Sequence, residues 1–325
     1  MNTETTLRSR SYTDEDAQAV CDLLNLCDAV DKLDDNYSVD DLRREFEDPQ
    51  LDKHKDMRLW HSSEGILVGF GQIWVRTQND EAEGGTYIRI HPEYRQHNLE
   101  TEVLAWAEGR LREAQGQSGN RLVLRLWMPD TYKYMRDIAD NNGFKTERYF
   151  FEMIRPLNEA IEEPKFPEGY TLRHITAGDP AERWVDMFNM SFIDHWNHHP
   201  MTVEEHKHTL ASPKYVPERD LVAVAPDGEF AAFCFCLIDP EDNKRNNRSE
   251  GWIDILGTRR GHRKIGLGKA MLLSGLLRLK ADGMETAKLG VDAENPTGAL
   301  RLYESVGFRV RTTSISTSKE LAAAG

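Results

Sequence analysis

The feature that most constrains this chain is an internal repetition of its hydrophobic pattern. The first half predicts a strand, a capped helix, a hairpin, a strand, a long helix, a strand, a short helix and a last strand, and the second half repeats this order at an offset of about 165 residues. Residues 156–167, between the halves, contain prolines and several acids, which is typical of an interdomain linker. We therefore expect two tandem domains of class α/β (α+β), at 1–156 and 168–325, joined by a linker at 157–167.

The expected elements follow from strand-like and helix-like periodicity together with turn signals. In the first half they lie at 7–10, 12–27, 57–63, 66–75, 86–91, 99–115, 121–128, 132–141 and 149–155. In the second half they lie at 170–174, 179–192, 220–225, 229–238, 252–256, 266–281, 286–291, 298–306 and 309–316.

Charge and hydropathy narrow the possible partners. The formal net charge of −14 disfavours a general nucleic-acid binder, because neutralising phosphates requires a basic surface. No stretch approaches the roughly 18 uninterrupted apolar residues of a membrane span, and the first residues have neither the basic nor the apolar region of a secretory signal. We expect a cytoplasmic protein with no nucleic acid and no membrane as partner.

A basic segment punctuated by glycines joins the strand that ends near residue 256 to the long helix that begins near residue 266. Gly266 and Gly268 lack a Cβ atom, so the backbone can approach a ligand closely, and the N–H groups at the start of the helix favour an anion such as a pyrophosphate. Basic side chains add positive charge to this otherwise acidic chain at Arg259, Arg260, Arg263 and Lys264.

Two common phosphate motifs do not fit this segment. A P-loop requires a serine or threonine after its lysine, and Lys269 is followed by Ala270. A dinucleotide fingerprint requires a third glycine or alanine where the chain has Met271. Neither a P-loop nor a dinucleotide fold is expected.

The segment resembles instead the acetyl-CoA loop of the GNAT N-acetyltransferase superfamily. The family pattern Arg/Gln-x-x-Gly-x-Gly/Ala is met by Arg263, Gly266 and Gly268. A second family segment, which ends in Tyr-x-x-x-Gly-Phe, resembles residues 295–308, with its tyrosine at Tyr303. The element order of both halves also resembles tandem members of this family, so the resemblance extends over nearly the whole chain.

The resemblance implies a fold, a co-substrate and a set of binding residues. Each domain is expected to have a mixed, mostly antiparallel sheet flanked by helices and splayed where the co-substrate acetyl-CoA enters. Backbone groups near Leu256 and Gly257 would polarise the thioester oxygen. The implied cofactor-binding residues are Leu256, Gly257, Thr258, Arg263, Lys264, Ile265, Gly266, Leu267, Gly268, Lys269 and Asn295.

Acetyl transfer to an amine requires a base for the amine proton and an acid for the leaving thiolate. Tyr303 matches the family position of the acid and is protonated at neutral pH. Many relatives carry the glutamate base at the position of Trp252, so the base must lie elsewhere. Strand alternation places Glu250, Trp252, Asp254 and Leu256 on one face. Asp254 and Glu250 are the candidates, and the apolar surroundings of Asp254 are expected to raise its pKa.

A histidine-rich stretch follows the first helix of the second half. Its imidazoles lie on an irregular segment with no fixed ligand face, so no metal site is expected. The corresponding segment of the family covers the acceptor site. We therefore expect His195 and Trp196 to contact the substrate or to supply the base, and Trp252 to contact the substrate.

The N-terminal copy has lost the features on which the resemblance depends. Its loop has Asn98 and Glu100 where the other copy has Gly266 and Gly268, and a glutamate there would repel a phosphate. Ala139 stands at the position of the tyrosine acid. The C-terminal domain is therefore expected to be catalytic and the N-terminal domain non-catalytic.

The expected reaction is direct transfer of acetyl from acetyl-CoA to an amine in a ternary complex. The acceptor stays open between an amino-sugar or thiol-precursor amine, a polyamine or aminoglycoside, and a protein N-terminus. The chain is expected to be a monomer or homodimer. The alternative from another class is a CoA-binding regulatory or scaffolding protein without catalysis, which Trp252 at the usual glutamate position supports.

Overall fold

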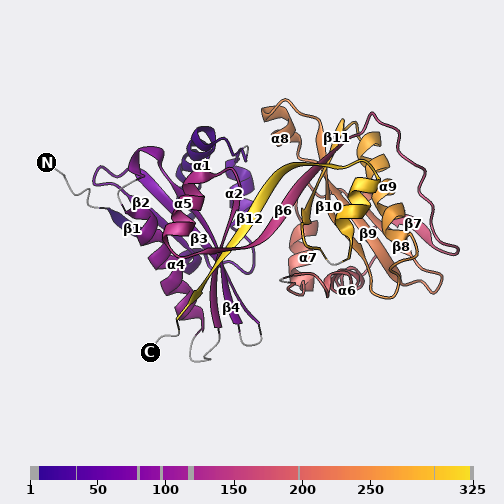
Figure 1. Ribbon diagram of the computed structural model, residues 1–325, viewed down its shortest axis with the longest axis horizontal. Coiled ribbons are helices and arrows are strands. Elements are labelled where there is room, and N and C mark those ends of the chain that lie inside the picture. The colour runs from indigo at the N-terminus through magenta and orange to yellow at the C-terminus, as the bar shows by residue number, and fades with distance from the viewer. Residues whose placement is uncertain are drawn as a thin grey trace. The chain divides into compact units, whose positions relative to one another are not determined.

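The computed structural model describes residues 7–33, 35–78, 81–95, 98–115, 121–196, 198–295 and 297–322. The chain forms two compact units (Figure 1). Unit 1 comprises Met1–Tyr149 and Ser314–Gly325, and unit 2 comprises Phe150–Thr313. Each unit has a mostly antiparallel sheet flanked by helices, as the sequence predicts. No helix of the described residues is both long and apolar enough to cross a membrane.

Unit 1 is built on a sheet with the strand order β1-β2-β3-β4-β5-β12. Its strands pair antiparallel except β4 with β5, which are parallel. The strands of the first half are β1 (Arg8–Ser11), β2 (Met57–His61), β3 (Leu67–Gln78), β4 (Glu81–Ile90) and β5 (Arg121–Pro129). The helices are α1 (Ala17–Asp31), α2 (Val39–Glu45), α3 (Lys53–Asp56), α4 (Leu99–Gln115) and α5 (Lys133–Asn141), with 3-10 turns at Asp14–Asp16 and Pro92–Tyr94.

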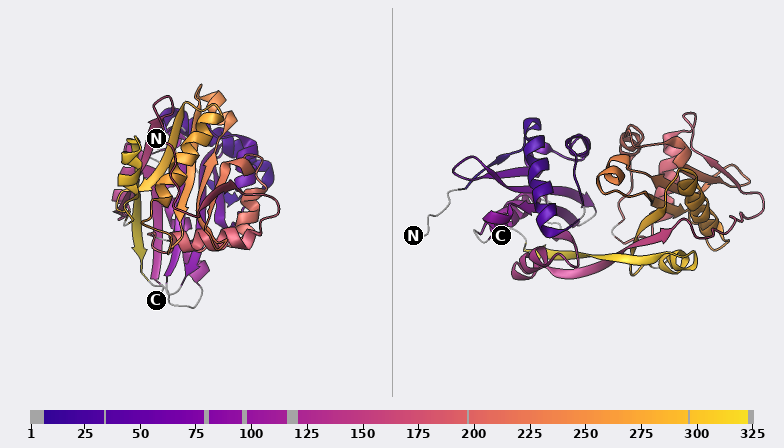
Figure 2. Two further views of the ribbon diagram at one scale, coloured as in Figure 1. Left: turned by 90° about the vertical axis from the view of Figure 1, so that its right-hand side faces the viewer. Right: turned by 90° about the horizontal axis from the view of Figure 1, so that it is seen from above.

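Apolar side chains cover both faces of this sheet. Helix α4 buries one stripe, including Leu99, Val103 and Leu111, against one face. Helix α1 buries Val20 and Leu24 in a separate cluster on strands β2 and β3, and its position over the sheet can be followed in Figure 2. Because these positions recur every three or four residues, each helix presents one apolar face to the sheet.

Unit 2 repeats this plan with the strand order β6-β11-β10-β9-β8-β7. The parallel pair is β10 with β11, the counterpart of β4 with β5. Its strands are β7 (Thr171–His174), β8 (Asp220–Val224), β9 (Phe230–Leu237), β10 (Glu250–Thr258) and β11 (Thr286–Asp292). Its helices are α6 (Ala181–Phe192), α7 (Val203–Leu210), α8 (Pro240–Arg245), α9 (Leu267–Ala281) and α10 (Ala299–Ser305), with a 3-10 turn at Pro217–Arg219.

Two clusters also cover the faces of the sheet in unit 2. Helix α9 packs Met271, Leu272 and Leu276 against one face, together with α10. Helix α6 packs Trp184 and Met187 against strands β8 and β9 on the other. The two faces of β9 therefore belong to different clusters. The cluster that a β10 side chain joins shows on which face of the sheet it lies.

The last strands of the two halves are exchanged. Strand β6 (Lys145–Pro156) pairs with β11 of unit 2 over Phe150–Pro156. Strand β12 (Arg309–Leu321) pairs with β5 of unit 1 over Ser314–Leu321. Each half of the sequence therefore supplies the strand that completes the sheet of the other unit.

This exchange moves the boundaries away from those expected from the sequence. The chain passes from unit 1 to unit 2 at residue 149 and returns at residue 314, because the last strand of each half finds its partner in the other unit. The segment 157–167, expected as a linker, lies within unit 2, where Leu157 is buried and Ile161 and Phe166 pack against the core beside α9. Its prolines give an irregular backbone, but its apolar residues attach it to unit 2.

Two short helices of unit 2 were not expected from the sequence. Helix α7 begins with a capping box, in which Thr202 and Glu205 satisfy each other's backbone N–H groups. Helix α8 is capped by Asp239, whose side chain accepts hydrogen bonds from the N–H groups of Glu241 and Asp242. Both helices are short, so hydrophobic periodicity gives little signal, and the caps are their main local determinants.

Candidate active site

Strands β10 and β11 separate in the middle of unit 2. They pair only over Glu250–Trp252 and Thr286–Lys288, although β10 continues to Thr258 and β11 to Asp292, all within the described residues. The backbone of β10 beyond Trp252 therefore has no strand partner on the β11 side. Such an opening exposes peptide N–H and C=O groups to a ligand, and it lies where the sequence predicts the splay.

A β-bulge occurs where the strands begin to separate. The register of β10 against β9 shifts between Ile253 and Ile255, which leaves Asp254 as the extra residue. A bulge redirects the side chains on either side of it and is common next to active sites. Asp254 is thus set apart by backbone geometry as well as by residue type.

The bulge corrects the predicted alternation of side chains. The sequence placed four residues on one face: Glu250, Trp252, Asp254 and Leu256. In the structure Leu256 packs against the α9 cluster, whereas Ile255 packs against the α6 cluster. One extra residue reverses the alternation beyond it, so Leu256 lies on the face opposite to the expected one.

The loop after β10 has the backbone geometry of a close-approach site. Gly266, the residue before α9, has φ 88°, a left-handed conformation that glycine adopts at little cost. A Cβ atom at Gly268 would lie 3.3 Å from Oγ1 of Thr258, so the first turn of α9 runs close to the end of β10. Nearby, Leu267 is buried in the core, whereas Ile265 is exposed. The N–H groups of this turn lie next to the opening between the strands.

Part of the positive charge expected in the loop is neutralised within unit 2. Arg259 forms ion pairs with Asp186 at 2.6 Å and Glu229 at 3.0 Å. His262 also contacts Glu229, at 2.9 Å, and Tyr170 at 2.7 Å. These side chains attach the loop to the neighbouring elements and are not free to meet a ligand.

Asp194, just after α6, binds two further arginines of the loop. It pairs with Arg260 and, at 2.7 Å, with Arg263. Lys264 has no ion-pair partner among the residues that the structure describes, and its φ of 66° is left-handed. Lys269 pairs with Glu162 at 2.8 Å. An anion at this loop would therefore meet mainly backbone N–H groups and Lys264.

Gly257 holds β10 and the end of α6 close together. A Cβ atom there would overlap the ring of Phe233 and lie 3.0 Å from Cβ of Ser191, so only glycine fits. Its backbone lies on the part of β10 that has separated from β11. The absence of a side chain thus lets β10 pack closely against Phe233 and the end of α6.

Asp254 combines solvent access with a raised pKa. Its side chain is exposed, but the protein around the bulge displaces bulk water and raises the pKa of Asp254 to about 6. The carboxylate is therefore largely ionised at neutral pH and still basic enough to accept a proton.

Glu250, the other predicted base, lies in an ion-pair network. Its carboxylate contacts Lys288 at 3.0 Å and Arg311 at 2.8 Å. Burial acts to raise the pKa of Glu250, but these two cations outweigh it and hold the pKa below its ordinary value. Arg311 also pairs with Glu152 at 2.6 Å. A carboxylate held ionised by two cations is a poor proton acceptor, so the geometry favours Asp254.

Tyr303 projects from α10 into the core next to α9. It is buried, and burial raises the pKa of its hydroxyl, with a smaller contribution from the thiol of Cys234. Tyr303 belongs to the same apolar cluster as Cys234 and Leu256, which pair across β9 and β10. Tyr303 stays protonated over the physiological pH range.

Asn295 lies in the turn between β11 and α10. Its side-chain oxygen accepts hydrogen bonds from the backbone N–H of Thr297 at 2.8 Å and from the hydroxyl of Thr297 at 2.5 Å. These bonds shape the chain that leads into α10. The visible role of this side chain is thus to order the turn.

The predicted substrate residues lie at two places in unit 2. His195 contacts the backbone oxygen of Trp196 through Nδ1 at 3.0 Å, and the Trp196 ring lies 5.9 Å from that of Phe150. Trp252 lies on β10 with the ammonium of Lys288 4.4 Å from its ring centre. Trp252, at the usual glutamate position, is therefore part of the network around Glu250.

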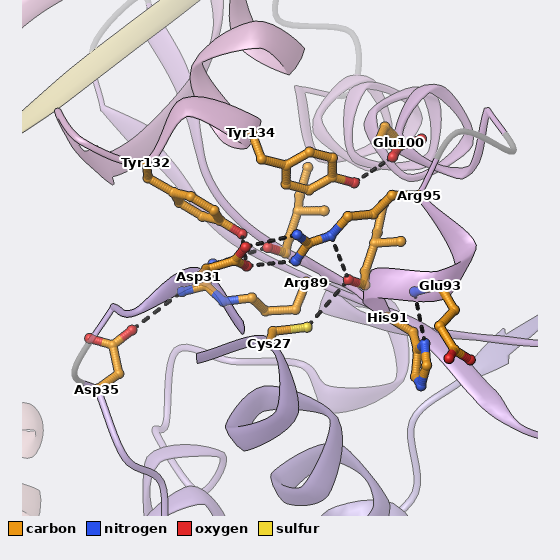
Figure 3. A network of polar contacts seen from close by, with 12 residues as sticks. Cys27, Asp31, Asp35, Arg89, His91, Glu93, Arg95, Glu100, Tyr132 and Tyr134 are labelled. Carbon is orange, nitrogen blue, oxygen red and sulfur yellow. Dashed lines mark hydrogen bonds and ion pairs between the residues drawn. The ribbon is translucent and has the colours of Figure 1, made fainter. Parts of the chain in front are cut away.

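In unit 1 a carboxylate side chain lies at the start of α4, the helix that corresponds to α9 (Figure 3). Glu100 lies in the first turn of α4 and accepts a hydrogen bond from the hydroxyl of Tyr134. Arg95 in the loop forms a bidentate pair with Asp31, at 2.7 and 2.6 Å. Both the helix start and the loop cation thus have partners within unit 1. Gln96 and His97 of this loop lie outside the described residues.

Arg89 fills the position of unit 1 that matches Gly257. It pairs with Phe70 across β3 and β4, as Gly257 pairs with Phe233 across β9 and β10. Its guanidinium is buried, lies 4.1 Å from the ring centre of Tyr87 and donates to the backbone oxygen of Ile88 at 3.1 Å. A large, buried side chain thus stands where unit 2 has the glycine at which β10 packs closely against the end of α6.

Comparison with known proteins gives consistent matches. A model described as the Acetyltransferase (GNAT) family matches residues 181–308. The mycothiol acetyltransferase of Salinispora arenicola is 27% identical over 297 residues, which cover 90% of this chain and 91% of that protein. The mycothiol acetyltransferase of Streptomyces coelicolor is 30% identical over 252 residues, 77% of this chain and 75% of that protein. A solved GCN5-related N-acetyltransferase from Sphaerobacter thermophilus has a similar fold, with TM-score 0.74 and 23% identity, covering 97% of this chain and 95% of that one.

Proposed function

The chain belongs to the GNAT acetyltransferase family, and we propose from that premise that unit 2 transfers acetyl from acetyl-CoA to a small-molecule amine. The observation that carries this proposal is the opening between β10 and β11, with a bulge at Asp254 and the glycine loop beside it. Acetyl-CoA and the amine would meet there in one ternary complex. No covalent enzyme intermediate is required.

The first turn of α9 is proposed to hold the pyrophosphate. Backbone N–H groups from Gly266 to Lys269 face an anion favourably because they lie at the start of the helix, and Lys264 adds a charge. Arg263 acts on the loop rather than on the phosphates, since its guanidinium is engaged by Asp194. The thioester then extends toward the separated part of β10.

The proposed chemistry assigns one proton step to each of two side chains. The amine nitrogen attacks the thioester carbon while Asp254 takes a proton from the nitrogen. Backbone groups near Leu256 and Gly257 stabilise the oxygen that becomes negative. The carbon–sulfur bond then breaks and Tyr303 protonates the CoA thiolate. Exchange with solvent restores both side chains.

Unit 1 is proposed to be non-catalytic and to bind no acetyl-CoA. Glu100 and its partner Tyr134 occupy the start of α4, where the pyrophosphate would lie, and like charges would repel. The position equivalent to Gly257 carries the buried side chain of Arg89. Ala139 replaces the tyrosine acid. One acetyl-CoA is therefore expected per chain.

The acceptor is proposed to be a small amine. Because the two named relatives are mycothiol acetyltransferases, an amine precursor of mycothiol is the first compound to test. A polyamine, an aminoglycoside and a peptide N-terminus are the further classes. His195, Trp196 and Trp252 are proposed to line the acceptor side.

Calorimetric titration with acetyl-CoA, followed by a thiol-release screen of these amines, tests the proposal. One equivalent bound with turnover on an amine supports it. Absence of binding rejects it, and two equivalents reject the assignment of unit 1. Binding of acetyl-CoA with no turnover on any amine would favour the alternative, a regulatory CoA-binding protein, for which Trp252 at the usual base position is the supporting feature.

A further inference from the structure

The loop after β10 is fastened to the end of α6 through one arginine. Arg263 donates through Nε to the backbone oxygen of Thr258 at 3.0 Å and through Nη2 to that of Ser191 at 2.8 Å. Its Nη1 pairs with Asp194 at 2.7 Å. All the hydrogen-bonding nitrogens of this guanidinium thus serve to join the strand end, the loop and the helix end.

Unit 1 contains the same arrangement. Arg95 donates through Nε to the backbone oxygen of Ile90 at 3.3 Å, and its other nitrogens pair with Asp31, the last residue of α1. Each arginine thus bonds to a carbonyl five positions earlier and to an aspartate at, or just after, the end of the first helix of its unit. The arrangement persists in unit 1 although the loop glycines do not, so it belongs to the architecture of the loop and not to phosphate binding.

The two aspartates differ in what else they hold. Asp31 is buried, with 8% of its side chain exposed, and accepts a further hydrogen bond from Tyr132 at 2.8 Å (Figure 3). Asp194 is 36% exposed and pairs with a second loop arginine, Arg260. The backbone N–H of Arg260 also donates to the oxygen of Met190 at 3.2 Å. Unit 2 therefore joins loop and helix through more groups, but in contact with water.

Asp194 is followed directly by the residues proposed to meet the acceptor. The backbone N–H of His195 donates to the oxygen of Phe192, the last residue of α6, at 2.7 Å, and the rings of these two residues lie 5.6 Å apart. The chain from Phe192 to Trp196 is thus one short turn built on the helix end. A displacement of Asp194 moves His195 and Trp196 with it.

We propose that Asp194 is a positioning residue that couples the cofactor loop to the acceptor segment. Binding of acetyl-CoA orders the loop from Arg260 to Gly268, and the pairs of Asp194 with Arg260 and Arg263 transmit this order to residues 190–196. The amine would then meet a formed acceptor segment only when acetyl-CoA is bound. This inference rests on the proposed function, because it requires acetyl-CoA to bind at the loop of unit 2.

Hydrogen–deuterium exchange on the full chain, with and without saturating acetyl-CoA, tests the coupling. In wild type, acetyl-CoA is expected to slow exchange in both 259–268 and 190–196. In Asp194→Asn it should still slow exchange in 259–268 but no longer in 190–196. The Kd for acetyl-CoA should rise about three- to tenfold, as expected for loss of solvent-exposed ion pairs. Asp194→Glu, which keeps the charge, should restore part of the protection.

Unit 1 provides the matched control. Asp31→Asn removes the equivalent aspartate from a buried pair, so it should lower the melting temperature at least as much as Asp194→Asn. It should leave both the Kd for acetyl-CoA and the protection of 190–196 unchanged. A purely structural role of Asp194 would instead make the two variants alike.

Several outcomes overturn the inference. Protection of 190–196 by acetyl-CoA that is equal in wild type and Asp194→Asn rejects the coupling while leaving the proposed function intact. If Asp194→Asn does not fold, Arg260→Gln removes one exposed pair and must show a partial loss of the same protection; its absence also rejects the coupling. If wild type gains no protection in 259–268, the cofactor site itself is misassigned and the proposed function fails first.

Discussion

Asn98 and Gly266 share one backbone conformation at equivalent places, with φ of 57° and 88° immediately before α4 and α9. Asparagine tolerates this left-handed conformation better than other residues with a side chain. The loop geometry of unit 1 is therefore preserved at Asn98. The sequence predicts that both replacements disable this loop. Because Asn98 keeps the backbone conformation, the difference that remains is the negative charge of Glu100.

This relationship predicts different effects for two substitutions in unit 2. Gly266→Asn should keep acetyl-CoA binding within a few-fold of wild type, because asparagine can retain the turn. Gly268→Glu should weaken it about 100-fold, since a carboxylate about 4 Å from a phosphate costs a few kcal/mol at protein surfaces. Isothermal titration calorimetry measures both.

The control for Gly268→Glu is Gly268→Ala, which adds only a Cβ atom 3.3 Å from Oγ1 of Thr258. It should bind acetyl-CoA nearly as well as wild type after a small shift of that threonine. Equal loss of binding in the alanine and glutamate variants would mean that space, and not charge, decides binding at this position.

Tyr303→Phe is predicted to separate binding from chemistry. Removing the proposed acid should lower kcat about 100-fold or more, with the Kd for acetyl-CoA unchanged. The ring stays in the core beside α9, so the melting temperature should change little. Stopped-flow or steady-state thiol release measures the rate; an unchanged kcat would remove Tyr303 from the mechanism.

The raised pKa of Asp254 predicts how activity and stability depend on pH. Its pKa is raised from 3.8 to about 6, so kcat/KM should rise with pH up to about 6 and level off above it, because the base must be ionised. The same shift means that the folded state binds more protons than the unfolded state between about pH 4 and pH 6. This group thus lowers stability as the pH rises through that window. Asp254→Asn should lose activity at pH 7 without losing thermal stability.

The comparison for Asp254→Asn is Glu250→Gln. The pKa of Glu250 is held low, so ionisation of this group stabilises the fold, and its loss leaves Lys288 and Arg311 without their shared carboxylate. Glu250→Gln should therefore lower the melting temperature by several degrees. Loss of the pH step near 6 in this variant, rather than in Asp254→Asn, would transfer the role of base to Glu250.

The exchanged strands predict where a C-terminal truncation acts. Ending the chain after Thr313 removes the part of β12 that pairs with β5 and buries Ile315 and Leu321 in unit 1. Unit 1 should lose about 5 kcal/mol or more of stability. Hydrogen exchange should become faster in α4 and β5, while unit 2 still binds acetyl-CoA. Faster exchange confined to α9 and β11 would contradict the assignment of the strand.

Local pattern predicts much of this structure. The helix expected at 99–115 is α4 with the same bounds, because a long amphipathic stripe leaves little ambiguity. The glycine loop is also where it was expected, since its spacing and residue types are local. The opening between β10 and β11 follows from the family resemblance.

Features that depend on partners distant in sequence were not predicted. The bulge at Asp254 changes a strict alternation by one residue, and nothing in residues 250–258 marks it. To predict that β12 pairs with β5, one must know which strand edge is unpaired. The hydrophobic pattern does not contain this information. Asp194 was missed for the same reason, although the parallel positions of Asp31 and Arg95 in the other half provide a signal that comparison of the halves can find.

The strand exchange also orders events during synthesis. Domains generally fold as they emerge, with the N-terminal one first. Here residues 314–321, which complete the sheet of unit 1, are translated after the whole of unit 2. On the ribosome the first unit must wait with an open edge beside β5 while the second acquires its full set of strands. The half that is made first is therefore the half that finishes folding last.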